Sequence, residues 1–293
     1  MKIWWSAFRP KTLTAAVVPV LVGTALAQAE TDRFEWWILV SVLAASLLIQ
    51  IATNLFNDAI DFEKGADTAE RTGPLRATAS GLLSRRQVYL AAGICCAIAL
   101  ALGVPLVLHG GWPIIAIGLI SLFLAYGYTG GPWPLAYLGL GDLFVILFFG
   151  VIAVSGTHYL HTGRWSELAL MAGLQVGFHA TTLIAINNLR DAPQDAKVGK
   201  RTLAVRFGPR FVRWEIALLA YAPFLLGVVY GPAGYRWAGM LPLIAVPLAG
   251  RLTRAVFSTA PGPLLNPVLA RAAALHLVAG LALAAGLFLG VRT

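Results

Sequence analysis

The stretch NLFNDAIDFEKGADTAERTGPLRATASG, Asn54 to Gly81, follows an apolar run and decides how the rest of the chain can fold. Amides and carboxylates recur in it at i, i+3, i+4 and i+7, which places them on one face of a helix end: Asn54, Asn57, Asp58 and Asp61. Carboxylates at the edge of a membrane span are costly unless something offsets them. Glycines and a proline then end the helix, and charges of both signs follow: Lys64, Asp67, Glu70, Arg71 and Arg76. Such a surface suits a divalent cation that bridges to a polyanion.

A second stretch, NNLRDAPQDAKVGKRTLAVRFG from Asn187 to Gly208, repeats this arrangement. It also closes an apolar run with amides and places two carboxylates, Asp191 and Asp195, at i and i+4. A glycine and several bases again come next: Gly199, Lys200, Arg201 and Arg206. We therefore expect the two stretches to be halves of one site.

The composition sets the class of protein. Hydrophobic residues make up 58% of the chain and charged residues 12%, whereas charged residues make up roughly a quarter of a soluble domain. The chain is therefore expected to be an all-α polytopic membrane protein.

Apolar runs long enough to cross the hydrocarbon core, roughly 17–25 residues, predict nine helices. They cover residues 12–29, 36–56, 88–108, 112–129, 141–160, 167–188, 213–231, 237–250 and 267–290. The eighth is short and contains Pro242 and Pro247, so its ends are poorly defined by the pattern. Because the acidic stretches close the second and sixth spans, we expect one membrane domain (1–293) made of two parallel four-helix repeats, 1–130 and 131–250, plus the ninth helix.

The distribution of basic residues predicts the orientation. Most of the 22 Lys and Arg residues lie at the N-terminus and in the loops after the even-numbered spans, which are expected to be cytoplasmic. All nine Trp residues fall at or near predicted span ends, as an interfacial aromatic belt requires. These loops and anionic lipid account for the net charge of +9, so no nucleic-acid partner is needed. We expect a bacterial inner-membrane protein whose N-terminus and site face the cytoplasm.

The two acidic stretches predict a metal and diphosphate site. Mg²⁺ prefers carboxylate and amide oxygens and usually stays bridged to substrate phosphates. The candidate metal ligands are Asp58, Asp61, Asp191 and Asp195, with Asp67 as a further candidate. The candidate diphosphate ligands are Asn54, Asn57, Lys64, Arg71, Arg76, Asn188, Lys200 and Arg201. A single such motif is ordinarily explained by loop charges that pair with one another, but two copies at matched span ends favour the metal site.

The pattern NxxNDxxD of Asn54 to Asp61, the later DxxxD and the nine-span layout resemble the UbiA superfamily of intramembrane aromatic prenyltransferases. Further motifs are similar to the branch that prenylates 1,4-dihydroxy-2-naphthoate in menaquinone biosynthesis. These motifs are WWSAFRPKTL at Trp4 to Leu13, GxDxxxRxGPxR at Gly65 to Arg76, GGPxPLAYxGLGD at Gly130 to Asp142, and the NNLRD and GKRTLAVRFG sequences. One departure is that Gly65 stands where the ubiquinone branch commonly has a third Asp, which leaves the role of Asp67 open.

The resemblance implies helices packed around a cavity and an allylic polyprenyl diphosphate held through Mg²⁺ at the two Asp motifs. Loss of diphosphate would leave an allylic cation that attacks the acceptor carbon bearing the carboxylate, with loss of CO₂, to form demethylmenaquinol. Two alternatives stay open: another aromatic acceptor such as 4-hydroxybenzoate, and a transporter of an anionic isoprenoid lipid. The sequence makes no prediction of oligomeric state.

Three further residues are candidates. Tyr128 is favoured by the resemblance, among the tyrosines near the Gly130 loop, as a ring that stabilises the allylic cation; the alternative is an interfacial tyrosine. Asp142 would orient or deprotonate an acceptor hydroxyl, or else pair with a loop base. His179 would either line the cavity or form a hydrogen bond inside the bundle.

Overall fold

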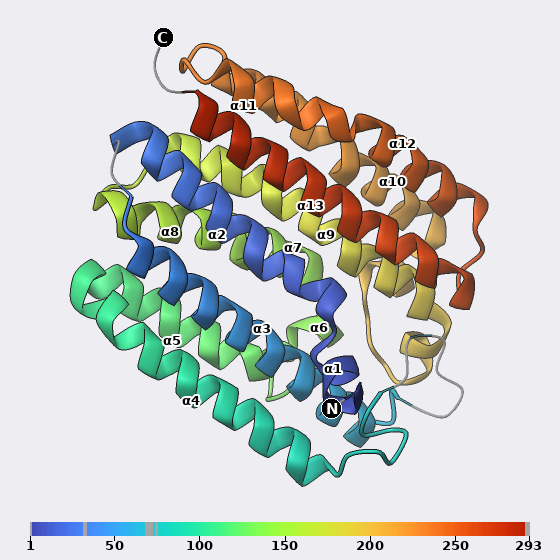
Figure 1. Ribbon diagram of the computed structural model, residues 1–293. Helices are drawn as coiled ribbons and strands as arrows, with labels where there is room; N and C mark the ends of the chain where they lie inside the picture. The colour runs from blue at the N-terminus through green and yellow to red at the C-terminus, as the bar shows by residue number, and fades with distance from the viewer. Residues whose placement is uncertain (1, 32–33, 68–72, 74–75, 291–293) are drawn as a thin grey trace.

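The computed structural model describes residues 2–31, 34–67, 73 and 76–290, and these residues form a bundle of helices without a strand (Figure 1). The first half contains α1 (Lys2–Phe8), α2 (Pro10–Thr31), α3 (Trp36–Glu63), α4 (Arg85–Gly110) and α5 (Trp112–Gly127). The middle contains α6 (Leu135–Leu138), α7 (Gly141–Ile146), the π-helix η1 (Leu147–Ile152) and α8 (Ala153–Thr162). The remainder contains α9 (Glu167–Lys197), α10 (Leu203–Leu226), η2 (Gly227–Tyr230), α11 (Arg236–Met240), η3 (Leu241–Ala245), α12 (Val246–Ser258), η4 (Pro263–Leu265) and α13 (Asn266–Leu289).

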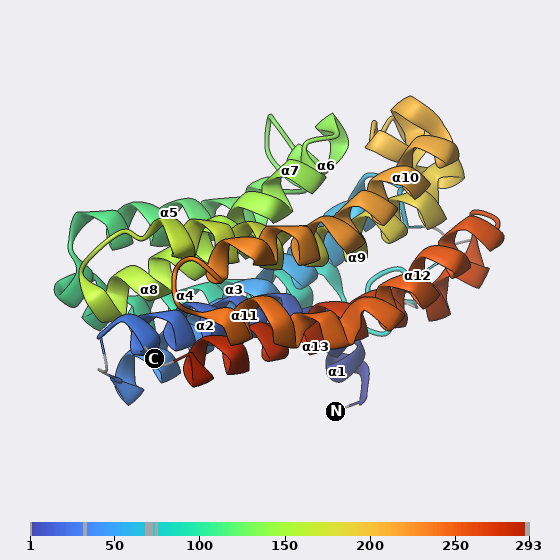
Figure 2. The ribbon, with the colours of Figure 1, turned by 90° about the horizontal axis from the view of Figure 1, so that it is seen from above.

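Within the described residues, eight helical segments are long and apolar enough to cross a membrane, and α5 is a shorter apolar helix. Each of the nine predicted spans corresponds to one of these segments. The helices run side by side along one common direction in both views (Figures 1 and 2). The all-α membrane fold is therefore confirmed, and the chain is an integral membrane protein.

The eighth span is longer than the sequence predicts. Instead of residues 237–250, the helical segment runs from Arg236 to Ser258. The 3₁₀ turn η3 follows α11 and contains Pro242, which cannot donate to a regular helix. The apolar run ends at Arg251, but α12 continues for two more turns with this side chain exposed. A charge ended the apolar pattern without ending the helix.

The fifth span contains the π-helix η1, where it crosses α9 at close range. A Cβ atom added to Gly150 of η1 would lie 2.3 Å from the Gly173 carbonyl oxygen and 2.5 Å from the Gly177 Cα atom of α9. Only glycine allows the two backbones to approach this closely. The contact fixes α7, and with it Asp142, against α9.

The core lies mainly where α2, α9, α10, α12 and α13 pack together. In contrast, α4 and α5 lie at one side of the bundle (Figure 1) and expose large apolar side chains such as Leu90, Ile98, Leu108 and Phe123. In water such a surface would favour aggregation, whereas in a bilayer it contacts lipid.

The ends of α3 and α9 lie at the same end of the bundle, beside α1 and the loop before α10 (Figures 1 and 2). Both helices run toward this end from the opposite side, where α13 finishes. Because each acidic stretch closes one of these helices, the fold brings the two stretches to one mouth.

Candidate active site

Asp58 lies one turn before the end of α3, and its carboxylate holds the loop that follows. Its Oδ2 accepts a hydrogen bond from the Ala77 N–H at 3.0 Å, and its Oδ1 accepts one from the Thr78 N–H at 3.1 Å. Asp58 is 1% exposed, so these two backbone donors offset much of the cost of burying its charge. The structure therefore gives Asp58 a loop-holding contact that the sequence did not reveal.

Asp61 lies on the same face of α3 and meets both a base and a phenol. The Arg76 Nη2 donates to its Oδ2 at 3.2 Å, and the Tyr137 hydroxyl donates to its Oδ1 at 3.1 Å. The Nε of Arg76 also lies 2.9 Å from the Oδ2 of Asp67. Arg76 is thus buried between two predicted metal ligands, and its predicted contact with diphosphate stays a prediction.

The second motif lies on the last turns of α9. Pro193 lies inside this helix, and α9 continues through it from Glu167 to Lys197. Asp191 and Asp195 are therefore about one helical turn apart on one face of α9. The Lys200 Nζ lies 3.6 Å from the Asp195 Oδ1. The Oδ2 of Asp195 is buried and has no hydrogen-bond partner in the part of the chain that the structure describes.

Arg190 is a functional candidate that the sequence analysis did not select. Its Nε and Nη2 donate to the two carboxylate oxygens of Asp191, at 2.8 and 2.7 Å, and its Nη1 donates to the Asn266 Oδ1 at 2.9 Å. Adjacent helix residues do not ordinarily face each other, so the spacing gave no reason to pair them. The available signal was a basic residue inside an acidic motif.

The amides have different surroundings. Asn54 donates to the Phe8 carbonyl oxygen at 3.0 Å and to the Thr12 hydroxyl at 3.1 Å, so it faces the α1–α2 turn. Asn57 accepts a hydrogen bond from the Thr129 hydroxyl, which ties α3 to the loop after α5. Asn188 is half-buried on α9.

The predicted loop bases gather around Tyr137. The Lys64 Nζ donates to the Thr129 carbonyl oxygen at 2.7 Å and lies 4.0 Å from the centre of the Tyr137 ring. The Lys200 Nζ lies 5.6 Å from the same ring centre. Arg201 is exposed beside them, whereas Arg71 lies outside the described residues.

Charges from both acidic stretches act on the same side chains. Burial lowers the pKa of Lys64, and the positive charge of Lys200 lowers it further, against the opposing effect of Asp61. Burial also raises the pKa of Tyr137, and the carboxylates of Asp61 and Asp195 both add to this increase. One phenol therefore senses an acid from each motif.

The carboxylates of the two motifs are suitable ligands for a hard divalent cation such as Mg²⁺. Each of them already contacts a base or backbone N–H groups. Among the described residues, no group of three or more His, Cys, Asp or Glu side chains is already arranged to hold a metal. The donors are nevertheless all oxygen atoms, as Mg²⁺ prefers. The buried Oδ2 of Asp195 lacks a partner that a cation would supply.

Tyr128 and Asp142 are more buried than the loop bases. The ring centre of Tyr128 lies 5.3 Å from that of Phe144. Asp142 is 5% exposed, and neither of its carboxylate oxygens has a hydrogen-bond partner in the described part of the chain. The alternative of an ion pair with a loop base is therefore not seen among the described bases.

His179 takes the second of its two predicted roles. Its Nε2 lies 3.2 Å from the Ala220 carbonyl oxygen of α10, and its ring is buried between helices. It forms a hydrogen bond inside the bundle and is not among the residues that line the apolar cavity between α2, α3, α4, α5 and the α7–α8 span.

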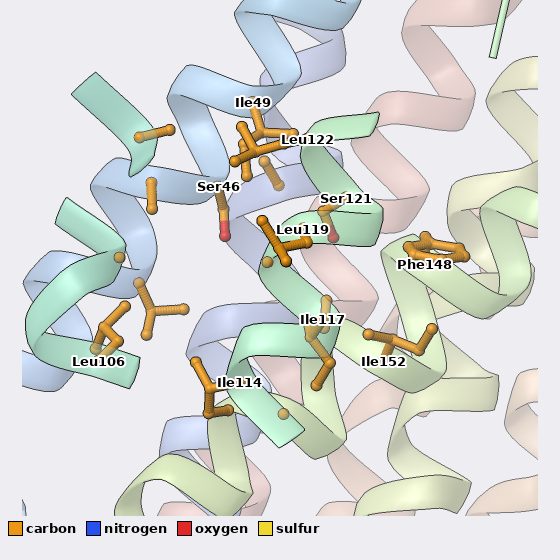
Figure 3. Close-up of a pocket in the computed structure, with 18 of the residues that line it drawn as sticks. Ser46, Ile49, Leu106, Ile114, Ile117, Leu119, Ser121, Leu122, Phe148 and Ile152 are labelled. Carbon is orange, nitrogen blue, oxygen red and sulfur yellow. The ribbon is translucent and has the colours of Figure 1, made fainter. Parts of the chain in front are cut away.

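An apolar cavity of about 420 Å³ lies below the first motif, between α2, α3, α4, α5 and the α7–α8 span. Gln50, one turn before Asn54, and Thr53, directly before it, line one end, and Leu106, Ile114 and Leu160 line the other. Figure 3 shows Ile117, Leu122, Phe148 and Ile152 among its walls, with Ser46 and Ser121 as the labelled polar side chains. The cavity suits an apolar chain, and its lining reaches Thr53, the residue before the first motif, but includes none of the motif carboxylates.

Comparisons with known proteins agree with this architecture. The UbiA prenyltransferase family matches residues 16–264. The chain is 37% identical to a 1,4-dihydroxy-2-naphthoate octaprenyltransferase of Mycobacterium tuberculosis, over 98% of this chain and 97% of that one. It is 32% identical to the Haemophilus influenzae protein of the same name, over 99% of this chain and 97% of that one.

A solved structure shares the fold. The UbiA homologue of Archaeoglobus fulgidus bound to DMAPP and Mg²⁺ aligns with a TM-score of 0.60 at 18% identity, covering 96% of this chain and 99% of that one. Together with the family match and the convergent Asp motifs, this likeness leads to one conclusion. The chain belongs to the UbiA prenyltransferase family and is an integral-membrane prenyltransferase, as the resemblance of its motifs predicted.

Proposed function

We propose that this protein transfers a polyprenyl group from an allylic polyprenyl diphosphate to 1,4-dihydroxy-2-naphthoate, with loss of CO₂, to form demethylmenaquinol. The observation that carries the proposal is the meeting of two acidic motifs, interleaved with bases, above one end of an apolar cavity. The names of the relatives at 32% and 37% identity support the naphthoate acceptor.

The acidic mouth would bind the diphosphate. Mg²⁺ would be held by Asp58, Asp61, Asp191 and Asp195. Asp67 is joined to this group by its ion pair with Arg76. The Mg²⁺-bound homologue supports the choice of metal. Bound Mg²⁺ would neutralise charge on the departing diphosphate. The ion pairs of Arg76 and Lys200 with the motif carboxylates would have to loosen for this, which frees both bases to contact phosphate oxygens.

The cavity would hold the prenyl tail. Its walls are apolar, and its lining reaches Thr53, directly before Asn54, so a donor whose head lies at the motifs can place its chain there without crossing the bundle. Exclusion of water would protect an allylic cation from hydrolysis. Tyr128, buried near Asp142 and Phe144, would present an electron-rich ring face to that cation.

Asp142 would act on the acceptor. A buried carboxylate without a hydrogen-bond partner among the described residues is costly, and an acceptor hydroxyl would supply the missing donor. The carboxylate would orient this hydroxyl and accept its proton as the ring attacks the allylic carbon. The basic mouth supports a cytoplasmic orientation.

The test is product formation in nanodiscs with Mg²⁺, a polyprenyl diphosphate and either 1,4-dihydroxy-2-naphthoate or 4-hydroxybenzoate, followed by mass spectrometry. We expect a prenylated naphthoquinol and release of the acceptor carboxylate as CO₂. Prenylated hydroxybenzoate instead would retain the reaction class and overturn the acceptor. No product with either, together with movement of the diphosphate across a sealed vesicle membrane, would favour the transporter.

A further inference from the structure

Arg9 joins α1 to α2 and has an unusual backbone. Its φ is +52°, and no other residue except glycine has a positive φ in the part of the chain that the structure describes. Its carbonyl oxygen accepts hydrogen bonds from both the N–H and the hydroxyl of Thr12, each at 2.9 Å. Non-glycine residues in this region are uncommon. They persist where the surroundings fix them, and they cluster at ligand-binding sites.

Asn54, the first residue of the acidic motif on α3, fixes this turn. Its Nδ2 donates to the Phe8 carbonyl oxygen on one side of Arg9 and to the Thr12 hydroxyl on the other. Trp4 and Phe8 of α1 also pack against the apolar residues of α3 and α4 next to it. The turn is therefore held from both sides by the helix that carries Asp58 and Asp61.

The Arg9 guanidinium lies within electrostatic range of both motifs. Burial lowers the pKa of Arg9, against the opposing charges of Asp58 and Asp61 from the first motif and Asp191 from the second, and Arg190 lowers it further. Its Nη2 is buried and has no hydrogen-bond partner among the described residues. A buried donor without a partner is costly, and an anion bound between the motifs would supply the partner.

We propose that Arg9 is a diphosphate-binding residue that serves both motifs, and that Asn54 is the positioning residue that directs it. The inference rests on the proposed function and adds a ligand from the α1–α2 turn, which belongs to neither motif. The planar guanidinium matches pairs of phosphate oxygens. Arg76 and Lys200, in contrast, already form ion pairs with motif carboxylates.

The design of the variants follows from the backbone. Arg9→Asn removes the guanidinium but keeps a residue that tolerates the left-handed region. Arg9→Lys keeps the charge without the planar fork. Arg86→Gln is the matched control, because it removes one positive charge from an exposed position at the same end of the bundle.

The first measurement is steady-state kinetics with each substrate varied in turn. We expect Arg9→Asn to raise the KM for the polyprenyl diphosphate about tenfold or more, to leave the acceptor KM within twofold, and to be partly rescued in Arg9→Lys. Asn54→Ala should raise the donor KM in the same way. The double variant should be no worse than Arg9→Asn alone, because the two residues would act through one contact. An unchanged donor KM in Arg9→Asn, or an equal rise in Arg86→Gln, would overturn the inference.

The second measurement separates this inference from the proposed function. Inorganic diphosphate with Mg²⁺ should raise the thermal unfolding midpoint of the full-length wild type in detergent, and Arg9→Asn should lose most of that increase. If wild type forms no prenylated product but shows an Arg9-dependent increase, the diphosphate site stands and the transfer reaction fails. If product forms and both variants show the same increase, the reaction stands and the role of Arg9 is wrong.

Discussion

The guanidinium of Arg190 forms two parallel hydrogen bonds with the carboxylate of Asp191, the next residue of α9, at 2.8 and 2.7 Å. The guanidinium neutralises the Asp191 carboxylate from within the second motif, and Arg190 is almost fully buried. A divalent ion at Asp191 would therefore compete with, or share, a carboxylate that is already neutralised. Single ion-pair contacts also join Asp61 to Arg76 and Asp195 to Lys200, so each of these three carboxylates already faces a base before substrate arrives.

The first prediction concerns this pair. Arg190→Gln should lower the free energy of unfolding by about 3 kcal/mol in EDTA, the low end for a broken buried ion pair because Asp191 is partly exposed. Mg²⁺ should restore part of the loss, since a cation can replace the guanidinium. Thermal unfolding in detergent, with and without Mg²⁺, measures both. Arg251→Gln, an exposed arginine of α12, is the control. An equal loss in the two conditions would contradict metal binding at Asp191.

The second prediction separates two carboxylates that look equivalent in the sequence. Asp195→Asn should leave the unfolding midpoint near that of wild type, because its Oδ2 has no hydrogen bond to lose among the described residues, and the ion pair that it gives up with Lys200 is long, at 3.6 Å. It should raise the Mg²⁺ concentration for half-maximal activity by at least the roughly tenfold typical of disturbed metal sites. Asp58→Asn, in contrast, turns an amide toward the N–H of Ala77 or Thr78 and should cost about 1–3 kcal/mol of stability. If Asp58→Asn instead raised the Mg²⁺ requirement without a loss of stability, and Asp195→Asn lost stability, Asp58 would be mainly a metal ligand.

The third prediction concerns Asp142. Asp142→Asn keeps the shape of the side chain and loses no hydrogen bond within the described residues, so the protein should fold normally. If the carboxylate takes the acceptor proton, turnover should fall by about 10²–10⁴, while the KM for the polyprenyl diphosphate stays constant. Single-turnover product formation measures the chemical step directly. Wild-type turnover in the variant would remove Asp142 from the reaction.

The fourth prediction tests the cavity. Gly118 lines it, and a Cβ atom there would meet no atom within 4 Å, so Gly118→Leu should extend a side chain into the space. We expect activity with long polyprenyl diphosphates to fall much more than activity with dimethylallyl diphosphate. Gly93→Leu makes the same change on an exposed position of α4 outside the cavity and is the control. Equal loss for short and long donors in Gly118→Leu would place the tail elsewhere.

Much of the fold could be predicted from the sequence because lipid imposes simple rules on length and apolarity. The nine spans were found for this reason, whereas the eighth was cut short because Arg251 ends the apolar run before the helix ends. The close crossing of Gly150 in η1 with Gly173 and Gly177 of α9 could not be predicted, since it depends on how the two helices pack. The division into two repeats stays a prediction.

The sequence predicted which residues gather at this end of the bundle but not their contacts, and their roles stay predictions. The spacing of Asp58 and Asp61 put both on one helix face, and the two motifs do meet at Tyr137. The sequence could not show that Asn54 faces the α1–α2 turn or that Arg190 pairs with its neighbour, because both depend on side-chain geometry. Arg9 was missed because it lies 45 residues before Asn54 and reaches the motifs only through the fold.

The central claim is that the two acidic motifs form one metal-dependent site for prenyl transfer. The most direct test measures prenylated naphthoquinol formed by wild type, Asp61→Asn and Asp195→Asn in nanodiscs, across a Mg²⁺ titration that starts in EDTA. The account predicts no product in EDTA, saturable recovery with Mg²⁺ in wild type, and a large shift of that curve to higher Mg²⁺ in both variants, one from each motif. Full activity in EDTA, or a shift in one variant with the other unchanged, would contradict a single shared site.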